Sequence, residues 1–322
     1  MTSTGGGPDA RDPVRADPDL RRLLRNLHAV EQQALVHLRL AAKLVRDPDL
    51  SSLLSAHHAE TECHRDALRA ELGSSGSWPR DLAATANRLG FLGLTAMGDD
   101  AAGKMLVDSI TYEYFEVAAY RLLGELAGER GEPGVAELAG RIAREEKAMA
   151  DRLTEWLDWA ARQAHRRSRC SASLRRHLQD VHALETQSAV LLRAGSHLVR
   201  RPDLRRYCAE ELKLTAGQRG RLRERLAELD SSPSGVRSGA MTLAGAAWGG
   251  VWGVQRYTAA KLTCFIYAER HLQVASYELL VREAIVCGDG ATGHLARDLL
   301  GQERGSADRM ELLLSRAADR SA

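Results

Sequence analysis

The stretch LHAVEQQA, residues 27–34, recurs as VHALETQS at residues 181–188. The two copies lie 154 residues apart, and each places a glutamate, Glu31 or Glu185, in an otherwise apolar helical stripe. A carboxylate that leaves water for such a position needs a compensating partner. The repeated stretch therefore indicates an internal duplication. Each of the two glutamates is expected to have a partner that compensates its buried charge.

Three further segments repeat in the same order, which is the expected signature of a tandem duplication. A chain of 322 residues is also long enough for two domains of about 150 residues each. The repeated pairs are DPDLSSLL (47–54) with RPDLRRYC (201–208), YEYFEVAAYRLL (112–123) with ERHLQVASYELL (269–280), and EEKAMADRL (145–153) with QERGSADRM (302–310).

The composition favours helices and excludes several classes of protein. Ala, Leu, Arg and Glu dominate, whereas aromatic residues make up only 5%. The formal net charge of +2 gives no field that would attract nucleic acid, and none is expected as a partner. Five scattered cysteines without a C-x-x-C pair indicate reduced thiols and a cytoplasmic protein. The longest uncharged run, 238–254, is short for a membrane span and rich in glycine, so we expect a buried connection and no membrane contact.

Helix start and stop signals predict four helices in each half. Asp17-Pro18 and Asp47-Pro48 each supply an N-cap followed by a first-turn proline. GERGEPG at 128–134 separates the third helix from the fourth, and a long crossover with one short helix fills 73–103. The order hairpin, long crossover, hairpin is typical of ferritin-like bundles, so we predict an all-α chain of two tandem four-helix bundles. The predicted parts are a disordered arm (1–17), a bundle with a metal site (18–163), a basic linker (164–172) and a degenerate bundle (173–318).

Heptad stepping along the four helices of the first half places polar residues in the core stripes. Glu31 and Glu60 are equidistant from one hairpin turn, and Glu116 and Glu145 are equidistant from the other, so all are expected at one level of the bundle. The candidate site residues are Glu31 on the first helix, His57, Glu60 and His64 on the second, Glu113 and Glu116 on the third, and Glu145 on the fourth.

Five buried carboxylates at one level repel one another, so they must either share protons or surround cations. Two divalent ions would nearly neutralise them. Carboxylate and imidazole ligands suit iron, manganese or zinc. A metal-free polar core that shares protons or holds water stays open as the alternative.

At these residues the first half resembles the YciE/YciF-type ferritin-like family. HAVEQQA, HHAETECH, YEYFEVAAY and REEKAMADRL correspond, in order and spacing, to that family's four helical stretches. The resemblance implies a four-helix bundle that can hold a dinuclear metal centre, and an association with stress responses. It makes the seven candidate residues the expected ligands. The chain departs from the di-iron pattern E-x-x-H, because Cys63 follows Glu60 and Ala148 follows Glu145 at that spacing.

The second half keeps Glu185 but has lost most of the other candidate ligands. Glu211 stands where the first half has His57, and Arg270 stands where it has Glu113. We hypothesise that the Arg270 guanidinium replaces the metal by pairing with Glu185 and Glu211.

Three functions are compatible with these patterns. The first is a dinuclear, iron-binding protein that oxidises Fe(II) with oxygen or peroxide. The second is a non-enzymatic, stress-associated helical module with a metal-free polar core. The third is manganese-dependent disproportionation of peroxide. Metal ions are the expected partners, and a homodimer of the chain stays open.

Overall fold

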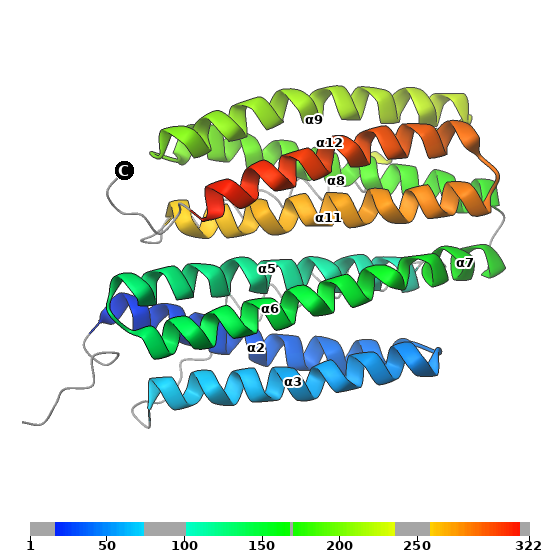
Figure 1. Cartoon of the computed structure of the whole chain (residues 1–322). Helices are drawn as coiled ribbons and strands as arrows, with labels where there is room; N and C mark the ends of the chain where they lie inside the picture. The colour runs from blue at the N-terminus through cyan, green and yellow to red at the C-terminus, as the bar shows by residue number, and fades with distance from the viewer. Residues whose placement is uncertain (1–16, 74–100, 168–169, 236–257, 316–322) are drawn as a thin grey trace, which may run out of the picture.

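The computed structural model describes residues 17–73, 101–167, 170–235 and 258–315. Within these ranges the chain is all-α and forms two four-helix units, as the sequence predicts (Figure 1). The N-terminal bundle contains α2 (Pro18–Leu44), α3 (Pro48–Leu72), α5 (Ala101–Glu129) and α6 (Pro133–Glu155), and it is followed by α7 (Leu157–Arg167). The C-terminal bundle contains α8 (Cys170–Leu198), α9 (Pro202–Glu228), α11 (Thr258–Val286) and α12 (Gly290–Leu314).

The predicted caps begin the first two helices. Asp17 accepts a hydrogen bond from the Asp19 amide at 2.8 Å, and Asp47 accepts one from the Asp49 amide at 3.1 Å. A proline follows each cap at the first helical position, where its missing N–H costs nothing. The α5–α6 turn uses Gly131, whose φ of 72° suits a residue without a Cβ. Local chemistry therefore determines where each hairpin turns.

Several predicted segments fall outside the described residues. These are residues 1–16 of the N-terminal arm, residues 74–100 of the crossover with its short helix, and the apolar run 238–254. Part of the predicted basic linker is described: residues 164–167 belong to α7, and α8 begins at Cys170. The boundaries of the predicted domains otherwise stay a prediction.

The fourth helix of the first bundle is followed, after a break at Trp156, by a short helix that the sequence did not predict. α6 ends at Glu155, Trp156 caps it, and α7 starts at Leu157. The interruption lets α7 bury Leu157 and Ala161 in a cluster that also contains Leu279 of α11. α7 therefore joins the core of the first bundle to the second.

The two bundles meet along α5 and α11, which lie side by side at the centre of the molecule (Figure 1). Tyr114 stacks on His271 with ring centroids 3.4 Å apart and an interplanar angle of 4°. Phe115 of α5 meets Phe265 of α11 at 5.1 Å. Each of these helices faces its own bundle on one side and the other bundle on the opposite side, so neither has a single apolar stripe.

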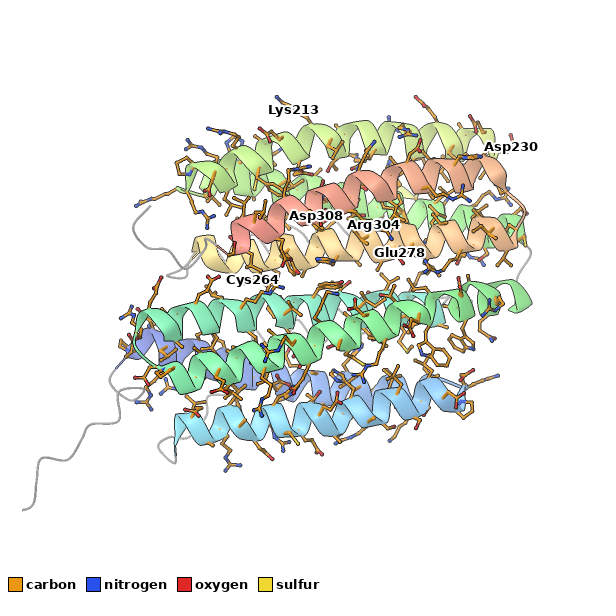
Figure 2. The ribbon with its side chains drawn as sticks, viewed as in Figure 1. Lys213, Asp230, Cys264, Glu278, Arg304 and Asp308 are labelled. Carbon is orange, nitrogen blue, oxygen red and sulfur yellow. The ribbon has the colours of Figure 1, made fainter. Side chains whose placement is uncertain are left out.

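Charged side chains cover the outer surface of the bundles, and many pair across neighbouring helices. Glu278 of α11 and Arg304 of α12 are 2.8 Å apart (Figure 2). Such partly exposed pairs contribute little to stability. Among the described helices, none has the length and hydropathy needed to cross a bilayer.

Candidate metal centre

Two groups of buried side chains in the N-terminal bundle have the spacing of metal ligands. Glu31, His64 and Glu146 form the first group, and His57, Glu113 and Glu146 form the second. Within each group, one donor atom of every residue lies within 4.8 Å of the others. Glu146 belongs to both groups, so the four helices α2, α3, α5 and α6 build two adjacent sites that share one carboxylate.

The buried stripes of α3 and α6 determine which side chains reach this centre. Residues seven apart return to nearly the same face of a helix, so His57 and His64 both point inward from α3. Thr61 lies between them and donates its hydroxyl to the His57 carbonyl at 2.9 Å, which satisfies its own polar group. On α6, Glu146 occupies the equivalent place between Ile142 and Met149.

His57 has one ring nitrogen inside the centre and the other at its edge. Its Nε2 lies 3.2 Å from Glu113 and 3.3 Å from Glu146. Its Nδ1 lies 3.0 Å from Glu60, whose side chain is 45% exposed. A metal-binding histidine commonly has this arrangement, because an outer carboxylate holds the second nitrogen and orients the ring.

His64 shows the same division with its nitrogens exchanged. Its Nδ1 lies 2.8 Å from Glu146 and 3.9 Å from Glu31. Its Nε2 lies 2.8 Å from Glu145, whose side chain is also 45% exposed. Each imidazole therefore presents one nitrogen to the shared carboxylate and fixes the other on a glutamate at the surface.

Several donor atoms of this centre are buried and make no hydrogen bond within the described part of the chain. They are Oε2 of Glu31, Oε1 of Glu116, both carboxylate oxygens of Glu146 and Nδ1 of His64. The Tyr120 hydroxyl donates to Glu31, so only one oxygen of that carboxylate is satisfied. Buried polar atoms without hydrogen-bond partners are costly. The convergence of these oxygen and nitrogen atoms fits the binding of a cation.

Burial and mutual repulsion alter the pKa values of three carboxyl groups. Burial, reinforced by the charge of Glu146, raises the pKa of Glu31 to about 8. Burial also raises the pKa of Glu113 to about 7, although His57 opposes the shift. Burial and the neighbouring carboxylates raise the pKa of Glu116 well above its usual value. At neutral pH without metal, these groups hold protons for much of the time.

Glu146 behaves in the opposite way because both imidazoles face it. Burial alone raises its pKa, but the adjacent imidazoles of His57 and His64 outweigh burial and lower the pKa to about 2. The same contacts act on the imidazoles: burial lowers their pKa values, yet the carboxylates raise that of His57 to about 12 and that of His64 to about 9. Without metal, protonated imidazoles therefore balance the ionised Glu146.

The donor set fits two divalent cations. Four buried carboxylates, Glu31, Glu113, Glu116 and Glu146, carry four negative charges when fully ionised. Two divalent ions supply four positive charges, and the two imidazoles then bind as neutral ligands. Carboxylate oxygen with imidazole nitrogen suits iron, manganese or zinc. Protons balance the charges in the absence of metal, as the raised pKa values of Glu31 and Glu116 indicate.

Comparison with known proteins places the chain in a family. A family model described as a domain of unknown function, DUF892, matches residues 19–166 and again residues 171–322. The chain belongs to this family. DUF892 is the YciE/YciF ferritin-like family, so the resemblance seen in the first half extends to a tandem pair of DUF892 domains. No curated protein and no solved structure matches the chain.

The structure corrects the sequence prediction about which carboxylates of the N-terminal bundle lie together in its core. It brings together Glu31, Glu113 and Glu116, but it leaves Glu60 and Glu145 at the surface. The buried stripes step 57, 61, 64 on α3 and 142, 146, 149 on α6, so Thr61 and Glu146 face inward. Heptad stepping placed Glu60 and Glu145 in the core stripes, with Glu146 beside Glu145, because adjacent positions both lie within the width of an amphipathic stripe.

Glu146 is the buried carboxylate of both groups that the sequence prediction did not include among the candidate ligands. A signal was nevertheless present: the second copy keeps a glutamate at the matching position, Glu303, and replaces Glu145 by Gln302. Glu303 is fully buried. The retained member of the pair therefore marks the inward face of this helix in both bundles.

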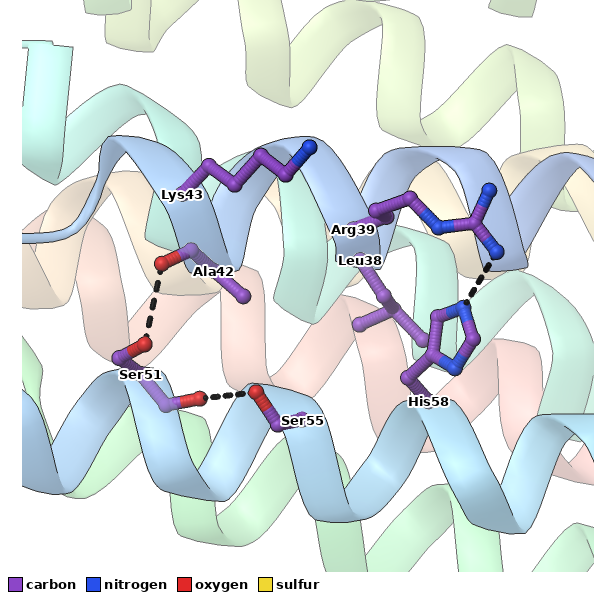
Figure 3. Close-up of a pocket in the computed structure, with 7 residues that line it drawn as sticks. All are labelled: Leu38, Arg39, Ala42, Lys43, Ser51, Ser55 and His58. Atoms are coloured by element: carbon purple, nitrogen blue, oxygen red, sulfur yellow. Dashed lines mark hydrogen bonds between the residues drawn. The ribbon is translucent and has the colours of Figure 1, made fainter.

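A surface hollow of about 350 Å³ lies between α2 and α3, away from the ligand groups (Figure 3). Arg39 and Lys43 line it, and Arg39 contacts the His58 ring at 3.4 Å. Two cationic side chains repel an approaching metal ion.

In the C-terminal bundle, a buried arginine occupies the place of the ligands. Arg270 is fully buried, and its Nη1 donates to Glu303 at 2.9 Å and lies 3.8 Å from Glu211. Its Nε donates to Glu269 at 2.8 Å. Among the described residues, both groups with metal-ligand spacing lie in the N-terminal bundle.

The predicted ion pair between Arg270 and Glu185 is wrong as a direct contact. Glu185 instead accepts a hydrogen bond from the Tyr277 hydroxyl at 2.7 Å. Tyr120 donates to Glu31 in the same way in the first bundle. Each of the repeated glutamates therefore has its own tyrosine partner. They differ in the nearby cationic groups, which are imidazoles in the first bundle and a guanidinium in the second.

Proposed function

We propose that the N-terminal bundle holds a dinuclear metal centre, with iron as its resident metal, and that it oxidises Fe(II) with oxygen or peroxide. The observation that carries this proposal is the pair of ligand groups joined by Glu146. Membership of the ferritin-like DUF892 family supports it, as does the match between four carboxylates and two divalent cations. A role in removing oxidants during stress follows from this chemistry.

The ligands divide between the two ions. Glu31 and Nδ1 of His64 serve one ion, and Glu113 and Nε2 of His57 serve the other. Glu146 would serve both ions, since its Oε1 faces His64 and its Oε2 faces His57. Glu116 adds the fourth carboxylate. Glu60 and Glu145 hold the outer nitrogens of the imidazoles and act as positioning residues.

Two ferrous ions held by these residues would supply two electrons, one each. Hydrogen peroxide needs two electrons and two protons to be reduced to two waters. The chain assists by holding protons next to the centre on groups such as Tyr120, whose hydroxyl faces Glu31. The buried walls exclude bulk water and keep the ligands ordered.

Anaerobic loading of the full chain with Fe(II) tests the proposal. We expect about two equivalents of iron per chain, because two ligand groups are present. Addition of peroxide should then oxidise the bound Fe(II), followed by the near-ultraviolet absorbance of ferric carboxylates. Manganese uptake with oxygen release from peroxide would instead support disproportionation. Failure to retain iron, manganese or zinc would contradict a metal centre and favour the non-enzymatic module.

Metal affinity should rise with pH, because metal must displace protons from this centre. At pH 7 the groups with raised pKa values, Glu31 near 8 and His64 near 9, still hold protons that must leave on binding. We expect the apparent affinity to rise by about tenfold or more per pH unit between pH 6 and 8. Titration calorimetry in buffers of different ionisation enthalpy measures the protons released. A constant affinity with no proton release would contradict the assigned ligands.

A further inference from the structure

Two cysteines from opposite ends of the C-terminal half meet near the junction of the bundles. Cys170 is the first residue of α8, and Cys287 directly follows α11 in the turn before α12. Both side chains are partly exposed. Neither belongs to the candidate metal centre, and the proposed function makes no use of them.

The antiparallel packing of α8 against α11 brings the two cysteines together. Glu185 bonds Tyr277, and further along the same pair of helices His177 lies 3.2 Å from Glu283. Moving back along α8 therefore corresponds to moving forward along α11, as in an antiparallel pair. Cys287 follows Glu283 by one helical turn, and Cys170 precedes His177 by two, so both lie beyond this ion pair at the same end of the bundle.

Direct contact between the thiols agrees with this register. The neighbouring Cys170 side chain raises the pKa of the Cys287 thiol, as expected for two thiols that lie next to each other. Cys287 also packs against the apolar cluster formed by the first turns of α8 and the last turns of α11, which includes Leu174, Leu178 and Ala284. The pair is therefore held in place by the fold.

We propose that Cys170 and Cys287 form a redox site, whose two thiols are oxidised to a disulfide by hydrogen peroxide. In the first step the sulfur of Cys170 attacks the peroxide oxygen, the O–O bond breaks and one water leaves, which gives a sulfenic acid. In the second step the sulfur of Cys287 attacks that sulfur and expels a second water. The two thiols are thereby oxidised by two electrons, and the peroxide is reduced to two waters.

The assignment of roles follows from the surroundings of the pair. Burial and the contact with Cys170 raise the pKa of the Cys287 thiol, which makes it the poorer initial nucleophile and the resolving partner. Cys208 and Cys264 are buried, and Cys63 is exposed on α3 in the other bundle. The disulfide would tie the start of α8, directly after the bundle junction, to the turn between α11 and α12.

Mass spectrometry of the metal-free full chain tests this proposal without relying on the metal centre. The Cys63→Ser background removes the exposed cysteine and leaves four thiols of the five in the sequence. Brief treatment with hydrogen peroxide should lower the mass by about 2 Da and leave two of the four thiols open to alkylation after unfolding. Peptide mapping should link Cys170 to Cys287, and dithiothreitol should restore both thiols.

A matched variant separates disulfide formation from general oxidation. In the same background, Cys287→Ser should abolish the 2 Da loss and leave Cys170 as a sulfenic acid that dimedone traps. The proposal would be overturned if peroxide left all four thiols free, or if it linked any other pair of cysteines. Loss of iron binding in separate experiments would leave this result unaffected, because the test uses metal-free protein.

Discussion

Replacement of Glu146 by glutamine is expected to abolish metal loading of the N-terminal bundle. Glu146 is the one residue common to both ligand groups, and its two oxygens face the two imidazoles. The amide of glutamine carries no charge and offers only one oxygen, so both ions lose a ligand. We expect the affinity to fall by more than about 100-fold, since loss of an outer partner alone costs about 10–100-fold. Elemental analysis after loading with Fe(II) measures the remaining metal.

Glu145→Gln provides the matched control, because it alters the neighbouring residue on the same helix. Glu145 contacts only the outer nitrogen of His64, so its loss should weaken binding by about 10–100-fold and still permit two ions at saturating metal. Far-UV circular dichroism should show both variants to be helical. If Glu145→Gln lost the metal and Glu146→Gln retained it, the inward face assigned to α6 would be wrong.

Replacement of Arg270 by alanine is expected to destabilise the C-terminal bundle strongly. Its guanidinium is fully buried and neutralises Glu303 and Glu269, with Glu211 close by. Removing one partner leaves buried carboxylates uncompensated, which costs about 3–5 kcal/mol. Urea denaturation of the full chain, followed by circular dichroism, measures the change in the free energy of unfolding.

The size of this effect should depend on pH. Burial already raises the pKa of Glu303 when Arg270 is present, and loss of the guanidinium raises it further. Because the folded variant then binds a proton that the unfolded chain has released, the destabilisation should grow as the pH rises above the ordinary glutamate range. Arg304→Ala is the control: that side chain is 58% exposed, so its loss should cost less than about 1 kcal/mol. Equal effects of the two substitutions would contradict the role of Arg270 as an internal cation.

Much of the fold was predictable from local patterns. The Asp-Pro pairs at 17–18 and 47–48 begin helices because the aspartate caps free amides and the proline needs no hydrogen bond. The repeated segments predicted two equivalent bundles, which the tandem DUF892 match confirms. The break at Trp156 was not predicted, because it depends on the packing of α7 against the second bundle and not on a local helix breaker.

The site was predictable to within one residue on two of its helices. Glu31, His57, His64, Glu113 and Glu116 reach the buried centre that the heptad pattern indicated. For Glu60 and Glu145 the pattern could not choose between adjacent positions, since a stripe more than 100° wide includes both. Only the direction from which neighbouring helices pack decides that Thr61 and Glu146 are covered while Glu60 and Glu145 reach the surface.

The sequence by itself determined the helices, their duplication and the residue types that converge in the first bundle, because these follow from capping, periodicity and spacing along one chain. The tertiary structure alone decided the pairings: Tyr277 rather than Arg270 on Glu185, Arg270 on Glu303, and α5 against α11. These contacts join residues far apart in the sequence. Their choice depends on how helices rotate and slide against one another, and that relative position is set by packing in three dimensions.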